Sequence, residues 1–359
     1  MKAAVCREFN APLVIEELEI APPGASEIEV RIAACAICHS DIHYMEGAWG
    51  GTLPAVYGHE AAGIVERVGS AVAGLEVGDH VVVTLIRSCG RCSYCTCGAP
   101  VHCDTRFPLD QTSPLVDHIG ATVAQGLRTG AFAERVVVEA TQAVAVPHDI
   151  PLESASLLAC GVITGLGAVT NTAKVPAGAS VVVIGTGGVG LNSVQGARLS
   201  GADPIIAVDL AASKRAAAER FGATHTIDPA GDDARAVVKS LTGGHGADYV
   251  FVTVGAKAAY QQGLGLLART GTLIVVGMPP SGVCAEVEIA DFAYRGQRII
   301  GSLMGSSRIS VDIPKLVSFY RSGRLMLDEL ITGRFPLARI NEAIASVGRG
   351  ETLRNVITF

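Results

Sequence analysis

Five of the ten cysteines lie within one short segment, SCGRCSYCTCGAPVHC, from Ser88 to Cys103. Thiols gathered in this way serve disulfides, iron–sulfur clusters or zinc sites. A bacterial ferredoxin run has three residues and then a following proline around its last cysteine. Here seven residues separate Cys95 from Cys103, and Asp104 follows. The spacing therefore disfavours an iron–sulfur cluster and leaves a disulfide or a zinc site.

Three further segments carry residues of the types that bind metal. They read CHSDIH from Cys38, GHE from Gly58, and LLACGVITG around Cys160. A catalytic zinc site needs about three protein ligands and one open coordination position. Isolated cysteines are usually small core residues, so burial in the core is predicted for Cys6, Cys35 and Cys284.

A glycine-rich turn occurs in VVVIGTGGVG, where Gly185, Gly187 and Gly190 have the spacing G-x-G-x-x-G. It follows a predicted strand and opens a predicted helix, and Asp209 ends the next strand. This context predicts a dinucleotide site in which the helix N-terminus stabilises the pyrophosphate. Asp209 would accept hydrogen bonds from the ribose hydroxyls and repel a 2′-phosphate, which favours NAD over NADP.

The composition limits the classes of protein to consider. The chain has 359 residues, so two domains are expected, and its hydrophobic fraction of 49% with only 5% aromatics predicts an aliphatic core. A net charge of −6 without a basic block gives nucleic-acid binding little support. No apolar run approaches 20 residues and MKAAVCREF lacks a signal-peptide core, so we expect a cytoplasmic protein with no membrane span. Cytoplasmic thiols stay reduced, which favours metal over disulfides.

Short Val- and Ile-rich segments separated by turn residues make residues 1–150 a predicted β-rich region. Strands at 180–185, 204–209, 224–228, 247–255 and 271–279 then alternate with helices at 191–199, 213–222, 233–243 and 259–270, which predicts a parallel sheet. A helix at 313–325 and a strand at 354–359 would return to the first domain. Residues 104–130 form a long connection without obvious structure.

In their order along the chain, these motifs and the terminal LRNVITF resemble the zinc-dependent medium-chain alcohol dehydrogenases, over essentially the whole length. The resemblance implies an α/β protein with a GroES-like catalytic domain, residues 1–160 with 304–359 returning to it. A Rossmann domain with a doubly wound parallel sheet would span residues 161–303, and the active site would lie in the cleft between the two domains.

The resemblance also implies roles for individual residues. The catalytic zinc ligands would be Cys38, His59 and Cys160. Polar neighbours would be Glu60, which can approach the metal, Asp41, which orients His59, and Ser40 and His43, which carry the substrate proton to solvent. Cofactor contacts would come from His39, Thr164, Gly185, Gly187, Gly188, Val189, Gly190, Asp209, Lys214 and Arg354. A structural zinc would be held by Cys89, Cys92, Cys95 and Cys103, leaving Cys97 as an extra thiol beside it.

The implied reaction is the reversible oxidation of an alcohol, with two zinc ions per chain and NAD. Family pocket positions fall on Trp49, Leu85, Phe132, Met278 and Leu303, and their apolar character fits a hydrophobic primary or secondary alcohol. Several of them could equally be core residues. Glutathione-dependent formaldehyde dehydrogenases are the nearest alternative, but the segment YMEGAWGGTLP holds only one acid, Glu46, and His43 stands where that subgroup has a tyrosine. A non-catalytic zinc- and dinucleotide-binding protein is the second alternative.

The expected partners are a small alcohol or aldehyde and further copies of the chain. The resemblance implies a homodimer or homotetramer paired through the edge of the nucleotide-binding domain. Neither nucleic acid nor a membrane is expected as a partner.

Overall fold

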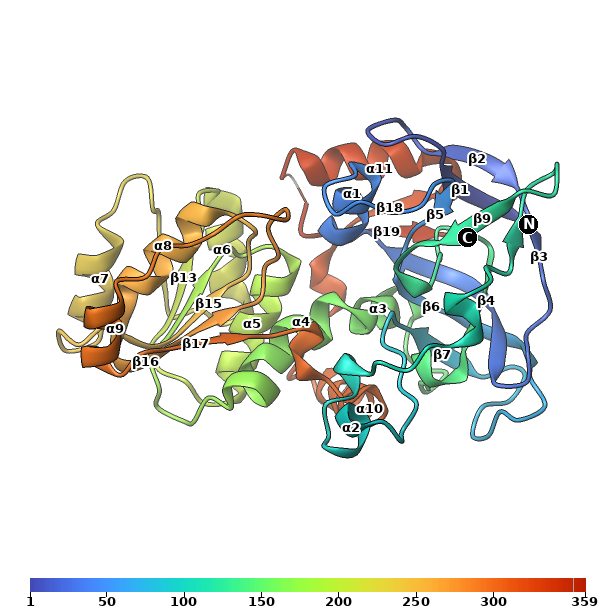
Figure 1. Ribbon diagram of the computed structural model, residues 1–359. Helices are drawn as coiled ribbons and strands as arrows, with labels where there is room; N and C mark the ends of the chain where they lie inside the picture. Colours follow the sequence, from blue (N-terminus) through green and yellow to red (C-terminus); the bar gives the residue numbers. More distant parts are fainter. Residues whose placement is uncertain (351) are drawn as a thin grey trace. The chain divides into compact units, whose positions relative to one another are not determined.

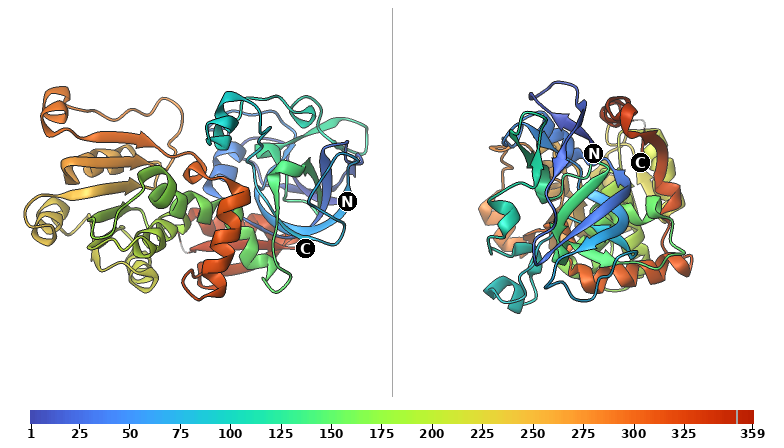
Figure 2. Two further views of the ribbon diagram at one scale, coloured as in Figure 1. Left: turned by 90° about the horizontal axis from the view of Figure 1, so that it is seen from below. Right: turned by 90° about the vertical axis from the view of Figure 1, so that its right-hand side faces the viewer.

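The computed structural model describes residues 1–350 and 352–359, which divide into two compact units. Unit 1 contains Met1–Cys160 and Arg308–Phe359, and unit 2 contains Gly161–Ser307. The chain therefore returns to unit 1 at Arg308, four residues after the predicted position 304. Each unit has its own sheet system in Figures 1 and 2, and both chain ends lie on unit 1.

The larger sheet of unit 1 has seven strands in the order β11-β7-β6-β4-β19-β18, with β10 also paired to β4. Their bounds are β4 Glu27–Ala36, β6 Glu60–Val68, β7 His80–Val83, β10 Arg135–Glu139, β11 Ala143–Ala145, β18 Ile331–Pro336 and β19 Arg354–Thr358. The C-terminal strand β19 lies antiparallel to β4, with Val356 opposite Ala36. This pairing carries the end of the chain back beside the segment that leads into Cys38.

The second sheet of unit 1 has the order β2-β1-β5-β9-β8-β3. Its strands are β1 Lys2–Cys6, β2 Val14–Glu17, β3 Glu19–Ile20, β5 Ala55–Val56, β8 Leu115–Val116 and β9 Thr122–Gln125. Two of these strands, β8 and β9, lie inside the 104–130 connection, which we predicted to lack obvious structure. They are too short for a clear period-two pattern, and their pairing with β3 and β5 decides their conformation.

Helices of unit 1 are short except near the C-terminus. They are α1 His39–Met45, α2 Ser93–Thr96, α3 Leu152–Ser156, α10 Ile309–Arg321 and α11 Ile340–Gly348. The core between these elements is aliphatic and includes the fully buried side chains of Ile28, Val81 and Phe132. Cys6 and Cys35 are also fully buried, as predicted, whereas Cys284 in unit 2 is exposed, so that part of the prediction is wrong.

Unit 2 is built on a six-stranded parallel sheet in the order β14-β13-β12-β15-β16-β17. The strands are β12 Val181–Ile184, β13 Ile205–Val208, β14 His225–Ile227, β15 Ala247–Val252, β16 Leu267–Val275 and β17 Arg298–Gly301. Numbered along the unit, this order is 3-2-1-4-5-6, the doubly wound arrangement, in which the chain reverses direction beside the first strand. The predicted parallel sheet is confirmed.

Five helices cover this sheet, with α5 Gly188–Leu199 against α6 Ala212–Phe221, and α7 Ala234–Leu241 against α8 Lys257–Leu266, before α9 Ile289–Arg295 (Figure 1). Right-handed crossovers on the two sides of β12 place the two pairs on opposite faces. The helix that we predicted to reach Thr270 ends at Leu266, because Leu267 already pairs with Ala247 as the first residue of β16. Sheet pairing here overrides the helical pattern of the sequence.

Unit 2 begins with α4 Gly161–Gly167, which continues as a π-helix over Ala168–Ala173. Against it lies the segment Met304–Ser306, in which three consecutive residues have positive φ angles of 47°, 63° and 49°. Thr172 Oγ1 lies 2.8 Å from Ser302 Oγ and 2.8 Å from Ser306 Oγ. Left-handed conformations cost of order 1 kcal/mol for residues other than glycine, so this turn depends on the contacts that hold it.

Among the described residues, no single helix combines the length and apolar composition needed to cross a membrane. One bent pair, Leu152–Ala159 with Gly161–Ala173, meets that test only when its halves are taken together.

Candidate metal centres and dinucleotide turn

The register between β4 and β6 brings two separate motifs to one place. Ala36 lies opposite Glu60 in this antiparallel pair. Cys38 follows β4 by two residues, and His59 immediately precedes β6, so both leave the sheet at the same end. Twenty residues lie between the cysteine and the histidine, and sheet pairing rather than local sequence brings the two together.

Asp41 organises these residues from the first turn of α1, where Cys38 is the residue at the helix N-cap. Its Oδ2 accepts a hydrogen bond from Cys38 N at 3.1 Å, and its Oδ1 accepts from Gly58 N at 2.9 Å. The same Oδ1 lies 2.9 Å from His59 Nδ1. A carboxylate on Nδ1 fixes the tautomer whose other nitrogen, Nε2, is free to bind a metal.

Cys160, the last residue of the first chain segment of unit 1, completes the group. It follows α3 and the 3₁₀ turn Leu157–Ala159, which pack on β4 and β6. One ligand atom from each of Cys38, His59, Glu60 and Cys160 lies within 4.8 Å of the others, and all four residues are buried. His59 Nε2 is buried without a hydrogen-bond partner. Such a polar atom is costly unless a metal occupies it, so the donor set fits zinc.

The acid–base properties of this group reflect its burial. The Cys160 thiol donating to Cys38, together with nearby His59, holds the pKa of Cys38 well below its usual value, and burial opposes the shift. Burial lowers the pKa of His59, but Asp41 and Cys38 together outweigh burial and raise it well above its usual value. Burial raises the pKa of Glu60 to about 7, against the attraction of Arg354. Two soft thiolates and an imidazole are a zinc-type donor set.

Arg354, the first residue of β19, lies behind this group. Its Nη2 is 3.1 Å from Glu60 Oε1, and its Nη1 donates to Ile37 O at 3.2 Å. Arg354 is 6% exposed and Glu60 is fully buried. Cofactor contact was the role that the resemblance implied for Arg354, and it stays a prediction. The structure adds an ion pair with Glu60 that sequence reasoning missed, because strand pairing of the C-terminus with β4 has no local signal.

The residues expected to carry a proton also lie on α1. Ser40 is partly exposed, and its neighbour His39, for which the resemblance implied a cofactor contact, is exposed. His43 Nδ1 lies 3.6 Å from Glu46 Oε2, and its ring centroid is 5.0 Å from that of Trp49. One face of α1 therefore presents Asp41 to the buried group, while His43 stays 26% exposed. The sequence analysis gave roles to these residues but predicted no helix here.

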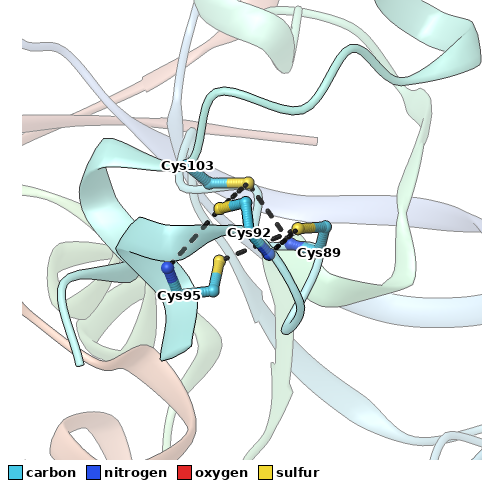
Figure 3. A group of neighbouring side chains, drawn as sticks. All are labelled: Cys89, Cys92, Cys95 and Cys103. Carbon is cyan, nitrogen blue, oxygen red and sulfur yellow. Dashed lines mark hydrogen bonds between the residues drawn. The ribbon is translucent and has the colours of Figure 1, made fainter. Parts of the chain in front are cut away.

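The second cluster is the cysteine lobe, residues 88–103, drawn in Figure 3. Cys89 Sγ is 4.0 Å from Cys95 Sγ, and Cys92 Sγ is 3.8 Å from Cys103 Sγ. Zn–S bonds of 2.3 Å in a tetrahedron put sulfurs about 3.8 Å apart, whereas a disulfide requires about 2 Å. The sulfurs therefore fit a four-thiolate zinc site and do not form disulfides, and all ten cysteines are free.

Backbone amides of the lobe point at the sulfurs. Cys92 N donates to Cys89 Sγ at 3.2 Å, and Arg91 N donates to the same sulfur at 3.4 Å. The Thr105 hydroxyl and the Arg91 amide lower the pKa of Cys89 to about 6. Such donors stabilise thiolates, the form that binds metal. Cys97 is exposed and donates to Tyr94 O at 3.3 Å, outside the group of four.

A buried arginine that sequence reasoning missed directly precedes the lobe in the chain. Arg87 is 2% exposed and donates to Asp110 Oδ1 at 2.7 Å and to Gln142 Oε1 at 2.7 Å. Residues 87 and 110 flank the four cysteines in the sequence. The only signal was a charged residue directly after the apolar segment VVVTLI.

In unit 2, the glycine turn has the geometry that its motif predicts. Gly185 directly follows β12 and has φ +90°, a conformation that favours glycine. A Cβ on Gly190 would lie 1.8 Å from Gly185 O, so close packing of the helix on the turn excludes a side chain there. Around Gly187 the space is open to 4 Å. An open backbone at the N-cap of α5 fits a pyrophosphate.

Asp209 follows β13 beside this turn. Its Oδ2 accepts from Thr186 N at 2.7 Å and its Oδ1 accepts from Ala211 N at 2.9 Å. Arg215 Nη1 donates hydrogen bonds to the carbonyl oxygens of Asp209 and Leu210, and Arg215 Nη2 forms an ion pair with Asp228 Oδ2 at 3.0 Å. Lys214 and Val189 are partly exposed near the same elements, and Thr164 Oγ1 donates to Met304 Sδ at 3.7 Å.

The five predicted pocket positions have different environments. Trp49 and Leu85 are partly buried, and Met278 and Leu303 are 55% and 40% exposed. Phe132 is fully buried in the core of unit 1, where its ring lies against Gly58. That is the core placement that the sequence left open for these residues.

Two family models match the chain. The alcohol dehydrogenase GroES-like domain matches residues 24–148, and the zinc-binding dehydrogenase domain matches residues 188–322. The first match lies within unit 1, and the second covers most of unit 2 and continues into residues 308–322 of unit 1.

Whole proteins with related sequences extend the match to both ends of the chain. The NDMA-dependent alcohol dehydrogenase of Amycolatopsis methanolica is 36% identical over 364 residues, covering 99% of this chain and 98% of its own. The alcohol dehydrogenase class-3 of Drosophila melanogaster is 36% identical over 372 residues, covering 100% and 97%. The solved structure of benzyl alcohol dehydrogenase from Acinetobacter calcoaceticus is 33% identical, with a TM-score of 0.93 and coverage of 100% and 99%. The chain belongs to the zinc-dependent medium-chain alcohol dehydrogenase family.

Proposed function

We propose that this protein reversibly oxidises a hydrophobic primary or secondary alcohol to the aldehyde or ketone, with NAD as the hydride acceptor. The observation that supports this most directly is the buried group of Cys38, His59 and Cys160, with the unpartnered His59 Nε2 and with Asp41 on the opposite ring nitrogen. A zinc ion held there supplies Lewis-acid chemistry that lowers the pKa of a bound alcohol.

The chain's own residues would hold and move the proton. Ser40, on the exposed side of α1, is the proposed acceptor of the alcohol proton, and His43 passes it to solvent. His43 suits this role because its side chain is partly exposed, with Nδ1 3.6 Å from the carboxylate of Glu46. Asp41 would keep the imidazole of His59 in one tautomer and orientation.

The pyrophosphate of the dinucleotide would bind at the turn Gly185–Gly190. The nicotinamide of the same cofactor would accept the hydride. Asp209 is the proposed partner of the adenosine ribose, and its carboxylate disfavours a 2′-phosphate. Arg215 lies nearby, but its guanidinium is already paired with Asp228 and two carbonyls. The other predicted cofactor contacts, at His39, Thr164, Gly188, Val189, Lys214 and Arg354, belong to the same proposal.

The apolar side chains of Trp49, Leu85, Met278 and Leu303 support a hydrophobic alcohol. The similarity to benzyl alcohol dehydrogenase is consistent with an aromatic one. A glutathione-dependent activity is the second candidate, because one relative is named a probable S-(hydroxymethyl)glutathione dehydrogenase. Against it, Glu46 is the one acid between Tyr44 and Pro54, and it lies beside His43.

One substrate panel tests these proposals. Purified protein is given short aliphatic, long aliphatic and aromatic alcohols, and formaldehyde with and without glutathione, each with NAD or NADP and read at the NADH absorbance band. NDMA is tried as an alternative acceptor because one relative depends on it. The proposal requires NAD reduction with an apolar alcohol; turnover only with formaldehyde and glutathione, or only with NDMA, would contradict it.

Zinc analysis accompanies the panel. We expect two zinc ions per chain, one in each cluster. A single ion confined to the cysteine lobe, together with no turnover, would instead indicate a non-catalytic binding protein.

We also propose a homodimer or homotetramer paired through the edge strand β17, on which Ile299 and Ile300 are 43% and 37% exposed. Unpaired edge strands with apolar side chains favour association. The cytoplasmic location stays a prediction from the sequence.

A further inference from the structure

Unit 2 contains a cavity at the end of its sheet opposite the glycine turn. It has a volume of about 580 Å³ and lies at the amino ends of the strands, beside Ser180, Pro204, Asp248 and Leu267. The glycine turn follows the carboxyl end of β12. The volume is in the range of small-molecule sites, and neither the family match nor the proposed dehydrogenase reaction uses this cavity.

Positive charge gathers around this cavity. Arg235, Lys239, Arg269 and Arg295 line it, against two acids, Asp203 and Asp248, in a chain whose overall net charge is −6. Asp248 already accepts hydrogen bonds from Ser180 N at 2.9 Å and Ser180 Oγ at 2.7 Å. Arg295 is paired with Asp291 at 2.7 Å.

Three of the cations remain without an acidic partner. Within residues 1–350 and 352–359, no ion pair is formed by Arg235, Lys239 or Arg269. The guanidinium of Arg269 lies over the ring of Tyr294, 5.2 Å from its centroid, which holds it in place without neutralising it.

Helix electrostatics explains only part of this arrangement. Cations are favourable in the last turn of a helix, and Lys239 and Arg295 occupy the last turns of α7 and α9. Arg235 instead lies in the first turn of α7, where the helix dipole disfavours a cation, and Arg269 lies on β16. A concave site with an excess of charge of one sign concentrates its field and attracts ions of the opposite sign, and here four cations face two acids.

We propose that this cavity is a binding site for a small polyanion, with the cations of Arg235, Lys239 and Arg269 as its ligands. An oligophosphate suits the arginine forks, because guanidinium groups form paired hydrogen bonds with phosphate oxygens. A polycarboxylate offers related chemistry, and the experiment separates the two. The site is independent of the dinucleotide turn and of the proposed alcohol oxidation.

The test is calorimetric titration of the full-length protein with inorganic tripolyphosphate and, separately, with citrate, at low and at physiological ionic strength. The triple variant R235Q/K239Q/R269Q is compared with a charge-matched control from the same unit, K174Q/R220Q/K257Q. Circular dichroism melting curves check that both variants fold. The wild-type titration is repeated with saturating NAD, because tripolyphosphate could also occupy the glycine turn.

We expect tripolyphosphate to bind the wild type and the control with equal affinity, and this binding should remain when NAD is present. The R235Q/K239Q/R269Q variant should bind tripolyphosphate at least about tenfold more weakly. Tighter binding of citrate than of tripolyphosphate would keep the site but overturn the phosphate assignment. Equal binding by both variants, displacement by NAD, or no binding at low ionic strength would overturn the site itself. A folded triple variant is expected because Arg235, Lys239 and Arg269 are exposed; if it melts early, Lys239→Gln alone must weaken binding.

Discussion

Asp41 and His59 lie side by side and fully buried, with Oδ1 of the carboxylate 2.9 Å from Nδ1 of the imidazole. The same carboxylate accepts hydrogen bonds from the backbone amides of Cys38 and Gly58. One acid therefore fixes the ring of one candidate ligand and the backbone of a second, before any metal binds.

Asp41→Asn tests this arrangement. An amide has one acceptor oxygen in place of two, so at least one of the three donors is left unsatisfied. We expect zinc affinity at the buried site to fall about 10- to 100-fold, measured by competition with a chelator. The zinc of the cysteine lobe serves as the internal control. Unchanged affinity would show that Asp41 does not position His59.

Replacing a proposed catalytic ligand should remove both metal and activity. For Cys38→Ser or His59→Ala, we expect zinc content to fall from two ions to one and turnover to drop by about a thousandfold or more. Cys284→Ser is the matched control, because Cys284 is exposed and outside both clusters. Wild-type turnover in either ligand variant would refute the assignment.

His43→Gln separates proton transfer from metal binding. Because His43 is partly exposed and outside the metal group, the variant should keep both zinc ions. Turnover should fall about tenfold, and its pH profile should change as the titrating imidazole is lost. If the pH profile stays that of the wild type, His43 has no place in the relay.

Thr172→Val tests the turn Met304–Ser306. The change removes the hydroxyl between Ser302 and Ser306, and we expect the free energy of unfolding to fall by about 1–2 kcal/mol in urea titrations. Thr172→Ser should restore it. Thr170→Val is the control on the same helix, since the Thr170 hydroxyl bonds to Leu166 O and Asn171 of that helix and not to the turn, within the part of the chain that the structure describes. If the two valine variants are equally stable, the turn does not depend on Thr172.

His80 and His148 give the protein a predictable response to acid. Their ring centroids are 4.2 Å apart, and burial, followed by repulsion from His148, lowers the pKa of His80. The unfolded chain then binds more protons than the native state once the pH falls below about 6.5. The stability contributed by neutral His80 is therefore present above that pH and lost as the pH falls through the lowered folded-state value.

The measurement compares urea unfolding at about pH 7.5 and about pH 5.5. His80→Gln should lose less stability on acidification than the wild type, by less than about 1 kcal/mol because the ring is partly exposed. His225→Gln, an exposed histidine away from this pair, should behave as the wild type. If His80→Gln loses as much stability on acidification as the wild type, the lowered pKa of His80 does not cause the acid response.

The sequence alone determined the features that depend on local spacing. The four cysteines of the lobe lie within fifteen residues, so their spacing already limits the geometry of a shared ion. The glycine turn was equally local, because Gly185 and Gly190 are required by one tight turn between a strand and its helix. Alternating apolar strands and helices likewise predicted the parallel sheet of unit 2.

Only the tertiary structure decided the features that depend on pairing between distant segments. Opposition of Ala36 and Glu60 across β4 and β6 closes the metal group, and β19 brings Arg354 to Glu60. The start of β16 at Leu267, the strands β8 and β9, and the exposure of Cys284 were mispredicted for the same reason. Hydrogen bonds between strands and burial are set by neighbours in space, and a helical or irregular local pattern gives way when they compete.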